Sequence, residues 1–282
     1  MPALPEIEVL HRDLEKEVVS RRFKDVEVRP GSTSMRLIPR HGRRKELQDL
    51  LVGAKVEAAT RAGRHLLMEL DTAHTLVVRL GPRGQLIKVS ASGEVAPHTH
   101  LVMSFTIGGQ LRIIDPDATS EVFVTPTDEL KTIHDELHGF EIDPLESPLA
   151  WQHFSAILEQ KARPMKELLA DESFIVGLGD LYSDEILFTS GLRYDRPSHQ
   201  LSSQDVRRLY RSLMETLQES VKARGTSYGE FEFTDLTGQP GAYQIELKVY
   251  ERSGEFCRRC RTPIQRVNFN GSDTYFCPQC QS

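Results

Sequence analysis

The chain opens with a helical pattern of apolar residues. Between Pro5 and Arg22, the positions Ile7, Leu10, Leu14 and Val18 recur at the spacing of one helix face. Acidic residues stand near the start of this segment, where the helix dipole favours negative charge. The pattern predicts a helix that begins almost at the first residue.

The next hundred residues show a different periodicity. From Lys24 to Val124, short apolar runs alternate with polar positions, and Gly or Pro residues separate the runs. This pattern is typical of an antiparallel β-sandwich. The clearest runs are Leu66–Leu70, Thr75–Val78, Leu101–Phe105 and Leu111–Ile114.

The second half returns to helical periodicity. Residues 126–148 carry prolines and acids and are expected to form a connector. Helices are expected at 151–170, 181–190 and 203–223. Gly177-Leu178-Gly179 stands between the first two of these. A glycine turn before a helix presents free backbone N–H groups, which suit a phosphate, although most such turns only connect helices.

All four cysteines lie near the carboxyl end, as Cys257-x2-Cys260 and Cys277-x2-Cys280. Two such pairs facing each other across a hairpin can complete a tetrahedron about Zn2+, and four protein ligands make the ion structural. Two disulfides or a mononuclear iron site are the alternatives. The alternating residues 265–269 and 274–276, with an Asn-Gly turn dipeptide between them, predict the hairpin itself.

Length and composition favour two modest domains and a small appendage. The chain has 282 residues, of which 39% are hydrophobic, enough to bury two cores. We expect an α+β fold with a catalytic-type β-sandwich domain at 1–125, a linker at 126–150, a helix-two-turn-helix domain at 151–250 and a zinc finger at 251–282. No signal peptide or membrane span is readable, so a cytoplasmic protein is expected.

The formal net charge of -6 argues against nucleic-acid binding by bulk electrostatics. Any contact with DNA must depend on local clusters of cations, and such clusters are more often solvated surface. Two clusters stand out: Arg40, Arg43, Arg44 and Lys45, and the arginines from position 252 onward.

In three stretches the chain resembles the formamidopyrimidine-DNA glycosylase and endonuclease VIII family. These are the start Met1-Pro2-Ala3-Leu4-Pro5-Glu6, the stretch Gly177–Glu185, and Gly238–Tyr243 running on to Cys257. They occur in the family's order together with the zinc knuckles. The resemblance implies an enzyme that flips a damaged base out of the duplex, displaces it with an amine and cleaves the strand by β-elimination.

The resemblance assigns the amine to Pro2. Removal of Met1 would leave a secondary amine, whose adduct with the sugar carbon is an iminium that acidifies the next C–H bond. A proline that merely leads a helix is the alternative. Glu6, one turn along, could orient or deprotonate the amine, or could simply be a favourable charge at a helix start.

Several positions depart from the family's pattern. The family has a glutamate as general acid or base where this chain has Ala3, so base excision should be the impaired step. Arg64 aligns with a lysine that contacts phosphate and assists elimination. Arginine keeps the charge but cannot readily transfer a proton. Pro82 replaces a methionine that fills the gap left by the flipped base, and Asp117 stands where a cation is expected.

Phosphate contacts are also altered. The family has an asparagine at the position of Asp180 and an arginine at that of Ser272. These changes predict weaker duplex binding or a different strand geometry. The remaining candidates for DNA contact, some of which could equally be plain surface, are His98, His100, Lys161, Arg163, Lys166, Gly179 and Arg259.

The glycine-rich segment 224–244 corresponds to the family's loop over the extruded base, unless it is only a long mobile loop. Together these features predict a monomeric, nucleoid-associated glycosylase and abasic-site lyase with damaged DNA as its partner and one zinc ion. A paralogue that binds damaged DNA without excising bases, and a zinc-ribbon adaptor for proteins, are the alternatives.

Overall fold

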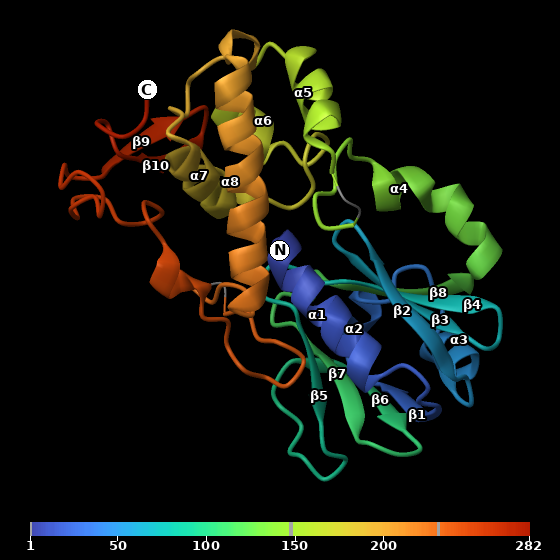
Figure 1. Ribbon diagram of the computed structural model, residues 1–282. Coiled ribbons are helices and arrows are strands. Elements are labelled where there is room, and N and C mark those ends of the chain that lie inside the picture. The colour runs from blue at the N-terminus through green and yellow to red at the C-terminus, as the bar shows by residue number, and fades with distance from the viewer. Residues whose placement is uncertain (1, 147–148, 230–231) are drawn as a thin grey trace. The chain divides into compact units, whose positions relative to one another are not determined.

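The computed structural model describes residues 2–146, 149–229 and 232–282, and the chain divides into two compact units (Figure 1). Unit 1 runs through Gly139 and takes in Ala223–Ala242, whereas unit 2 comprises Phe140–Lys222 and Tyr243–Ser282. These groupings differ from the expected bounds in two ways. Part of the glycine-rich segment belongs with the amino-terminal unit, and the zinc finger belongs with the helical one.

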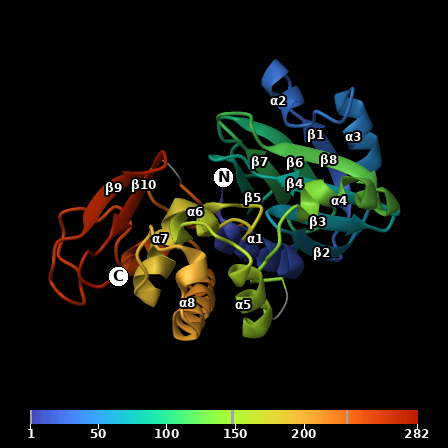
Figure 2. The ribbon, with the colours of Figure 1, turned by 90° about the horizontal axis from the view of Figure 1, so that it is seen from above.

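Unit 1 is built from two four-stranded antiparallel sheets and the amino-terminal helix. The sheets have the strand orders β2-β3-β4-β8 and β1-β6-β7-β5, as the sandwich pattern predicted. Helix α1 packs against β2 and β3 (Figure 2). The elements are α1 (Leu4–Glu17), β1 (Phe23–Val28), α2 (Ser32–Arg36), α3 (Arg44–Leu51), β2 (Val56–Ala62), β3 (His65–Leu70), β4 (His74–Arg79), β5 (Gln85–Val89), β6 (Thr99–Phe105), β7 (Gln110–Ile114), β8 (Glu121–Pro126), η1 (Thr127–Ile133) and α4 (His134–His138).

The apolar face of α1 explains its place on the sheet. Leu4, Ile7, Leu10 and Leu14 are each at most 1% exposed, so the face predicted from the spacing of the last three is the buried one. The helix ends at Glu17, five residues earlier than expected. Short helices α2 and α3 interrupt the region that was expected to be all strand, and η1 and α4 occupy the expected connector.

Unit 2 contains helices and the carboxy-terminal hairpin. Helix α7 packs against α6, α8 and β10. Its elements are α5 (Trp151–Glu159), α6 (Met165–Ala170), α7 (Gly179–Ser190), η2 (Ser198–Gln200), α8 (Ser203–Lys222), η3 (Tyr243–Glu246), β9 (Gln265–Phe269) and β10 (Ser272–Phe276).

The expected helix over 151–170 is two helices. Pro164 lies in the break between α5 and α6, because proline lacks an N–H group and disfavours helical backbone at the preceding residue. The hairpin turn is as predicted: Asn270 and Gly271 have φ of 50° and 92°, the two left-handed positions that an Asn-Gly turn supplies. Among the described residues, no helix is long and apolar enough to cross a membrane.

Candidate active site

The candidate nucleophile Pro2 lies directly before α1. Its side chain is half-buried, and Ala3 follows as the N-cap residue in extended conformation, with φ -78° and ψ 177°. No side chain caps this end of the helix. The carbonyl of Ala3 accepts the N–H of Ile7 at 3.1 Å, which fixes where the helix begins. Met1 lies outside the described residues.

Glu6 is held by the glycine-rich segment rather than pointing freely into solvent. It is 3% exposed, and its Oε1 accepts the backbone N–H of Thr226 at 2.7 Å. Gly225 has φ of 83°, and a Cβ there would come within 3.0 Å of the Glu6 Cγ. Glycine at 225 therefore allows both the left-handed turn and the close approach of this segment to α1.

A second carboxylate, Glu8, was missed by the sequence reasoning. Its oxygens accept the Nε–H groups of Arg12 at 2.7 Å and Arg61 at 2.6 Å. Burial opposes ionisation, but the hydrogen bonds from His11, Arg61 and Arg12 lower the pKa of Glu8 to about 2. Its partner Arg61 stands 53 residues away, so helical spacing could not reveal the pair.

Arg64 lies in the turn between β2 and β3 and is half-buried. The same Arg61 that bonds Glu8 also donates from Nη1 to the carbonyl of Gly63 at 3.2 Å. The turn that carries Arg64 is thereby tied to α1, the helix that Pro2 precedes. Both candidate groups are thus carried by parts of one hydrogen-bonded framework.

Two loops with family departures are joined by an ion pair. Arg83 Nε donates to Asp117 Oδ2 at 2.7 Å, and a second contact joins Nη2 to Oδ1. The buried carboxylate of Asp115 accepts the N–H groups of residues 117, 119 and 120, and Ser120 Oγ accepts the N–H of Gly81 at 2.9 Å. Asp117, where a cation was expected, is therefore matched by a cation from the other loop.

The two histidines differ. His98 is exposed, with φ of 61°. His100 is 6% exposed; its Nδ1 lies 3.1 Å from Ser34 Oγ and its Nε2 lies 2.8 Å from the carbonyl of Asp115. Both ring nitrogens of His100 are thus occupied inside unit 1, and its contribution is to support the Asp115 loop. A direct contact with DNA would require these bonds to open.

Lys166 was expected to contact DNA but is enclosed within unit 2. Only 2% of its side chain is exposed, and its Nζ donates to Asp180 O at 3.0 Å, Ser183 Oγ at 2.9 Å and Asp184 Oδ1 at 2.8 Å. Asp180 Oδ1 is also 3.1 Å away. Three internal bonds use the three donors of an ammonium, so Lys166 acts here as an internal counter-ion.

The glycine turn before α7 has the expected geometry. Gly177 and Gly179 have φ of 67° and 58°, and Gly179 is exposed as the first residue of the helix. Asp180 follows in the first turn, with its acid next to the Lys166 ammonium. Burial raises the pKa of neighbouring Asp184 to about 7, against the effect of Lys166. Asp184 also accepts the N–H of Tyr275 at 2.8 Å, which ties α7 to the hairpin.

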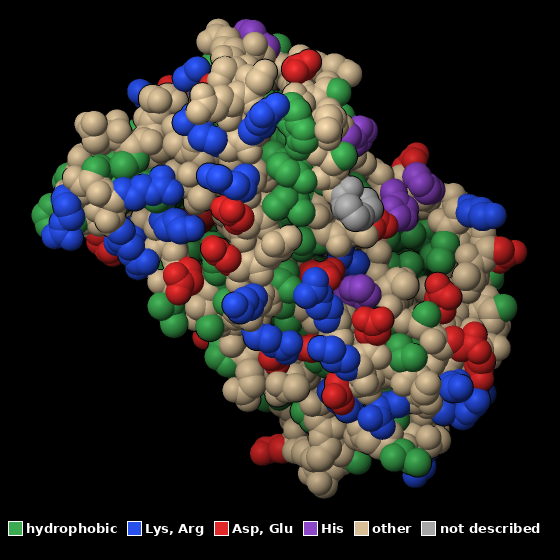
Figure 3. All heavy atoms as spheres, in the orientation of Figure 1, with side chains coloured by type: hydrophobic (Ala, Val, Ile, Leu, Met, Phe, Trp, Pro, Cys, Tyr) green, Lys and Arg blue, Asp and Glu red, His purple; other side chains and the backbone are tan. Residues whose placement is uncertain are grey.

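The other cationic candidates have partners of their own. Lys161 pairs with Glu141, and Arg163 pairs with Asp171. Arg259 donates from Nη1 to the carbonyl of Phe188 at 3.0 Å and lies 4.3 Å from that residue's ring centroid. Each side chain still has an exposed part. Figure 3 shows Lys and Arg side chains gathered on unit 2, over the zinc-finger end of the visible face.

The four cysteines lie together in an arrangement that could hold a metal ion. They are free thiols, and their Sγ atoms all lie within 4.8 Å of one another. The separations Cys257–Cys280 and Cys260–Cys277 are 3.9 and 3.4 Å. Tetrahedral Zn2+ with Zn–S bonds of about 2.3 Å needs sulfurs about 3.8 Å apart. The cysteines therefore fit one structural zinc ion, as predicted, and they pack on Phe188 and Val249.

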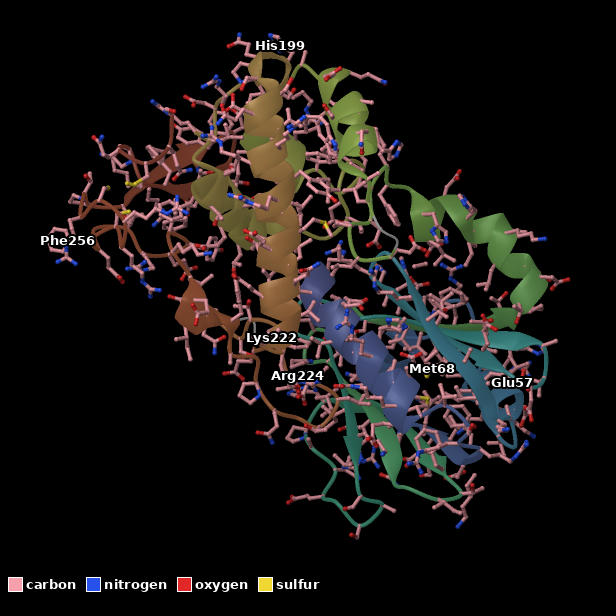
Figure 4. The ribbon with its side chains drawn as sticks, in the orientation of Figure 1. Glu57, Met68, His199, Lys222, Arg224 and Phe256 are labelled. Atoms are coloured by element: carbon pink, nitrogen blue, oxygen red, sulfur yellow. The ribbon has the colours of Figure 1, made fainter. Side chains whose placement is uncertain are left out.

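The segment 223–242 is anchored to unit 1 by Arg224. Its guanidinium bridges two buried carboxylates: Nη1 lies 2.8 Å from Asp13 Oδ1, and Nε lies 3.0 Å from Asp235 Oδ2. Figure 4 shows Arg224 on this segment, beside α1. Residues 230–231, inside the expected lid, lie outside the described residues. The link from Arg224 to Asp13 of α1 could not be read from the glycine content.

Comparison with known proteins covers nearly the whole chain. The model of the formamidopyrimidine-DNA glycosylase N-terminal domain matches residues 1–122, and that of the H2TH domain matches 140–232. The zinc finger found in FPG and IleRS matches 254–282. The three matches follow the order that the sequence motifs predicted.

Whole proteins give the same result. The formamidopyrimidine-DNA glycosylase of Pelotomaculum thermopropionicum is 33% identical over 287 residues, covering 100% of this chain and 99% of that protein. That of Geobacillus kaustophilus is 33% identical over 288 residues and is covered completely. The structure of Lactococcus lactis Fpg with DNA containing an abasic site has a TM-score of 0.86 at 27% identity, covering 99% of each chain. The chain belongs to the formamidopyrimidine-DNA glycosylase family.

Proposed function

We propose that this protein is a bifunctional DNA glycosylase and abasic-site lyase of base excision repair, with Pro2 as its nucleophile. The observation that carries the proposal is the full-length family match together with a half-buried Pro2 at the start of α1. Zinc supports the fold of the finger, and damaged DNA is the substrate. The relatives named above are bacterial, so we expect the protein to work on DNA of the nucleoid.

The proposed chemistry has two stages. The Pro2 amine, free once Met1 is removed, attacks C1′ of the damaged nucleoside, the glycosidic bond breaks and the base leaves with a proton. The amine loses its proton, the sugar ring opens at the C1′–O4′ bond with a proton from water going to O4′, and an iminium results. The iminium acidifies the C2′–H bond; loss of that proton expels the 3′ phosphate, and water then releases the amine from the sugar. An abasic site enters the same path as an aldehyde and needs no base expulsion.

This distinction sets the expected substrate ranking. Base departure requires a proton donor, and Ala3 supplies none. Glu6 lies nearby in sequence, but its Oε1 accepts the Thr226 N–H, so its proposed role is to hold the 223–242 segment against α1. Arg64 supplies charge to a phosphate rather than a proton. We therefore expect abasic-site cleavage to exceed release of oxidised purines.

Four groups are proposed to hold the DNA backbone: the N–H groups at Gly179 and the side chains of Lys161, Arg163 and Arg259. Each of these side chains already pairs with an acid or a carbonyl of the protein. Binding a DNA phosphate therefore means breaking that internal contact first. Duplex affinity should accordingly be modest. His98 is the exposed member of the histidine pair and the better candidate for contact.

Single-turnover rates test the proposal. The zinc-loaded protein is mixed in excess with duplexes that are identical except for an abasic site or an oxidised purine, and strand cleavage is followed with time. The proposal predicts cleavage of both, faster at the abasic site. Cleavage of neither, with binding to both intact, would support a paralogue that recognises damage without chemistry.

A further inference from the structure

The first zinc knuckle, residues 256–261, combines two unfavourable features. Phe256 is 57% exposed and projects from unit 2 (Figure 4). Arg261 has φ of 67°, a left-handed conformation that glycine adopts far more readily than arginine. An exposed aromatic ring and a strained backbone both reduce stability.

The two side chains form one stacked surface. The Arg261 guanidinium carbon lies 5.1 Å from the centroid of the Phe256 ring. Their backbones are fixed, because Arg261 N–H donates to Cys257 O at 2.9 Å and Phe256 pairs with Pro263 in a β-bridge. The zinc ligands Cys257 and Cys260, which adjoin Phe256 and Arg261 in sequence, would restrain the knuckle further. The backbone of the knuckle therefore holds the Phe256 ring in place. The Arg261 guanidinium lies over the ring, and much of the Phe256 side chain remains exposed to solvent.

The cations around this ring are not neutralised by acids. Within the described part of the chain, no carboxylate oxygen lies within 4 Å of the guanidinium nitrogens of Arg258, Arg259 or Arg261. Glu255, the nearest acid in sequence, is already paired with Arg252 at 2.9 Å. In a chain of net charge -6, these three arginines form a local concentration of positive charge without a carboxylate partner among the described residues.

We propose that this knuckle is a binding site for unpaired DNA, in which a base stacks on the open face of Phe256 and flanking phosphates contact Arg258 and Arg261. Every base has a flat face that stacks on an aromatic ring, and arginines beside such rings attract the backbone. Duplex DNA cannot use the ring, because its bases are already stacked. The site therefore adds a preference for single strands to the proposed function and does not depend on Pro2 chemistry.

The test measures affinity of the full, zinc-loaded protein for a short fluorescent oligothymidylate by anisotropy at fixed salt. Phe256→Leu keeps an apolar side chain but removes the stacking face, and should weaken binding about tenfold. Arg261→Gly should weaken it in the same direction while the thermal midpoint stays equal or rises, because glycine relieves the backbone strain. A thermal midpoint that is unchanged or higher distinguishes a loss of binding from misfolding.

Two exposed positions serve as matched controls. Ile107→Ala removes an apolar side chain that is 79% exposed in unit 1, and Arg211→Gln removes a cation whose side chain is 71% exposed on α8. Both should leave oligothymidylate affinity within about twofold, as expected for isolated surface changes. Equal affinity of Phe256→Leu, Arg261→Gly and the unaltered protein would overturn the proposal.

Two further outcomes are informative. If both knuckle variants keep oligothymidylate affinity but lose affinity for a labelled peptide of aspartates around one phenylalanine, the surface binds acidic protein segments and the DNA proposal is wrong. Borohydride trapping on an abasic duplex is run on the same samples. The absence of an adduct in every sample would contradict the proposed lyase activity. The oligothymidylate measurement would still show whether the knuckle binds unpaired DNA.

Discussion

The carboxylate of Glu6 accepts the backbone N–H of Thr226 at 2.7 Å, which joins the first turn of α1 to a segment 220 residues later in the chain. Both groups are buried. The bond places the glycine-rich segment beside the helix that Pro2 precedes. Glu6, which lies one helical turn from the proposed nucleophile Pro2, thus has a hydrogen-bond partner within the protein.

Replacing Glu6 tests this bond. Glu6→Ala leaves a buried N–H group without its acceptor and should lower the free energy of unfolding by about 1–3 kcal/mol. Glu6→Gln keeps an acceptor oxygen and should lose less. Urea denaturation of both variants measures the difference. Equal losses would mean that the contact with Thr226 contributes nothing specific.

Restoring a carboxylate at position 3 should restore base excision. Ala3 is the N-cap of α1 and is half-exposed, so Ala3→Glu places a negative charge at a helix start without burying it. We expect release of an oxidised purine to rise by about 10²–10⁴-fold, with abasic-site cleavage changed far less. Ala3→Gln, which cannot donate an acidic proton, is the control. An equal gain for both substrates, or for Gln, would refute the assignment.

Arg224 should contribute to stability through two carboxylates at once. Arg224→Met leaves Asp13 and Asp235 buried without their shared cation, and should cost about 2 kcal/mol, since the guanidinium itself is partly exposed. The double variant with Asp13→Asn should recover part of this loss. Thermodynamic cycles from urea titrations measure the coupling. Additive losses in the double variant would argue against a bridge.

Much of this account could be predicted from local sequence. The cysteine spacing and the Asn270-Gly271 dipeptide predicted the zinc hairpin, and the Ile7, Leu10, Leu14 spacing predicted the buried face of α1. Partners distant in sequence could not be predicted this way. Arg61 bonds Glu8, and Lys166 is enclosed by Asp184, because folding brings separate segments together. The break at Pro164 could be predicted from the proline itself, although the apolar pattern continues past it.

Acid should destabilise the protein through His65. Burial, and then the charge of Arg79, lower the pKa of His65 from 6.5 to about 4 in the folded state. As pH falls from 6.5 towards 4, the unfolded chain gains a proton that the folded one does not. The contribution of His65 to the free energy of unfolding should therefore be present in full above pH 6.5 and fall by about 3 kcal/mol across this window, and it is measured as the difference between the unaltered protein and a variant without this histidine. His65→Leu should flatten the profile, whereas His199→Gln, at an exposed site, should not.

Zinc removal should unfold the finger. Cys257 and Cys277 are buried against Phe188, Val249 and Ile264, so unpaired thiolates there would disrupt unit 2. Native mass spectrometry should give one zinc ion per chain. A chelator should lower the thermal midpoint and abolish DNA binding, and added zinc should restore both. A zinc-free protein with an unchanged midpoint would contradict a structural role for the ion.

Borohydride trapping tests the role of Pro2 most directly. The purified protein, with Met1 removal confirmed by mass, is incubated with an abasic-site duplex and borohydride, beside Pro2→Gly and a sample with a blocked amino terminus. We predict a covalent adduct whose attachment maps to Pro2 and which is lost on blocking. A protein that binds the same duplex but forms no adduct, or forms one unaffected by blocking, would contradict Pro2 as the nucleophile.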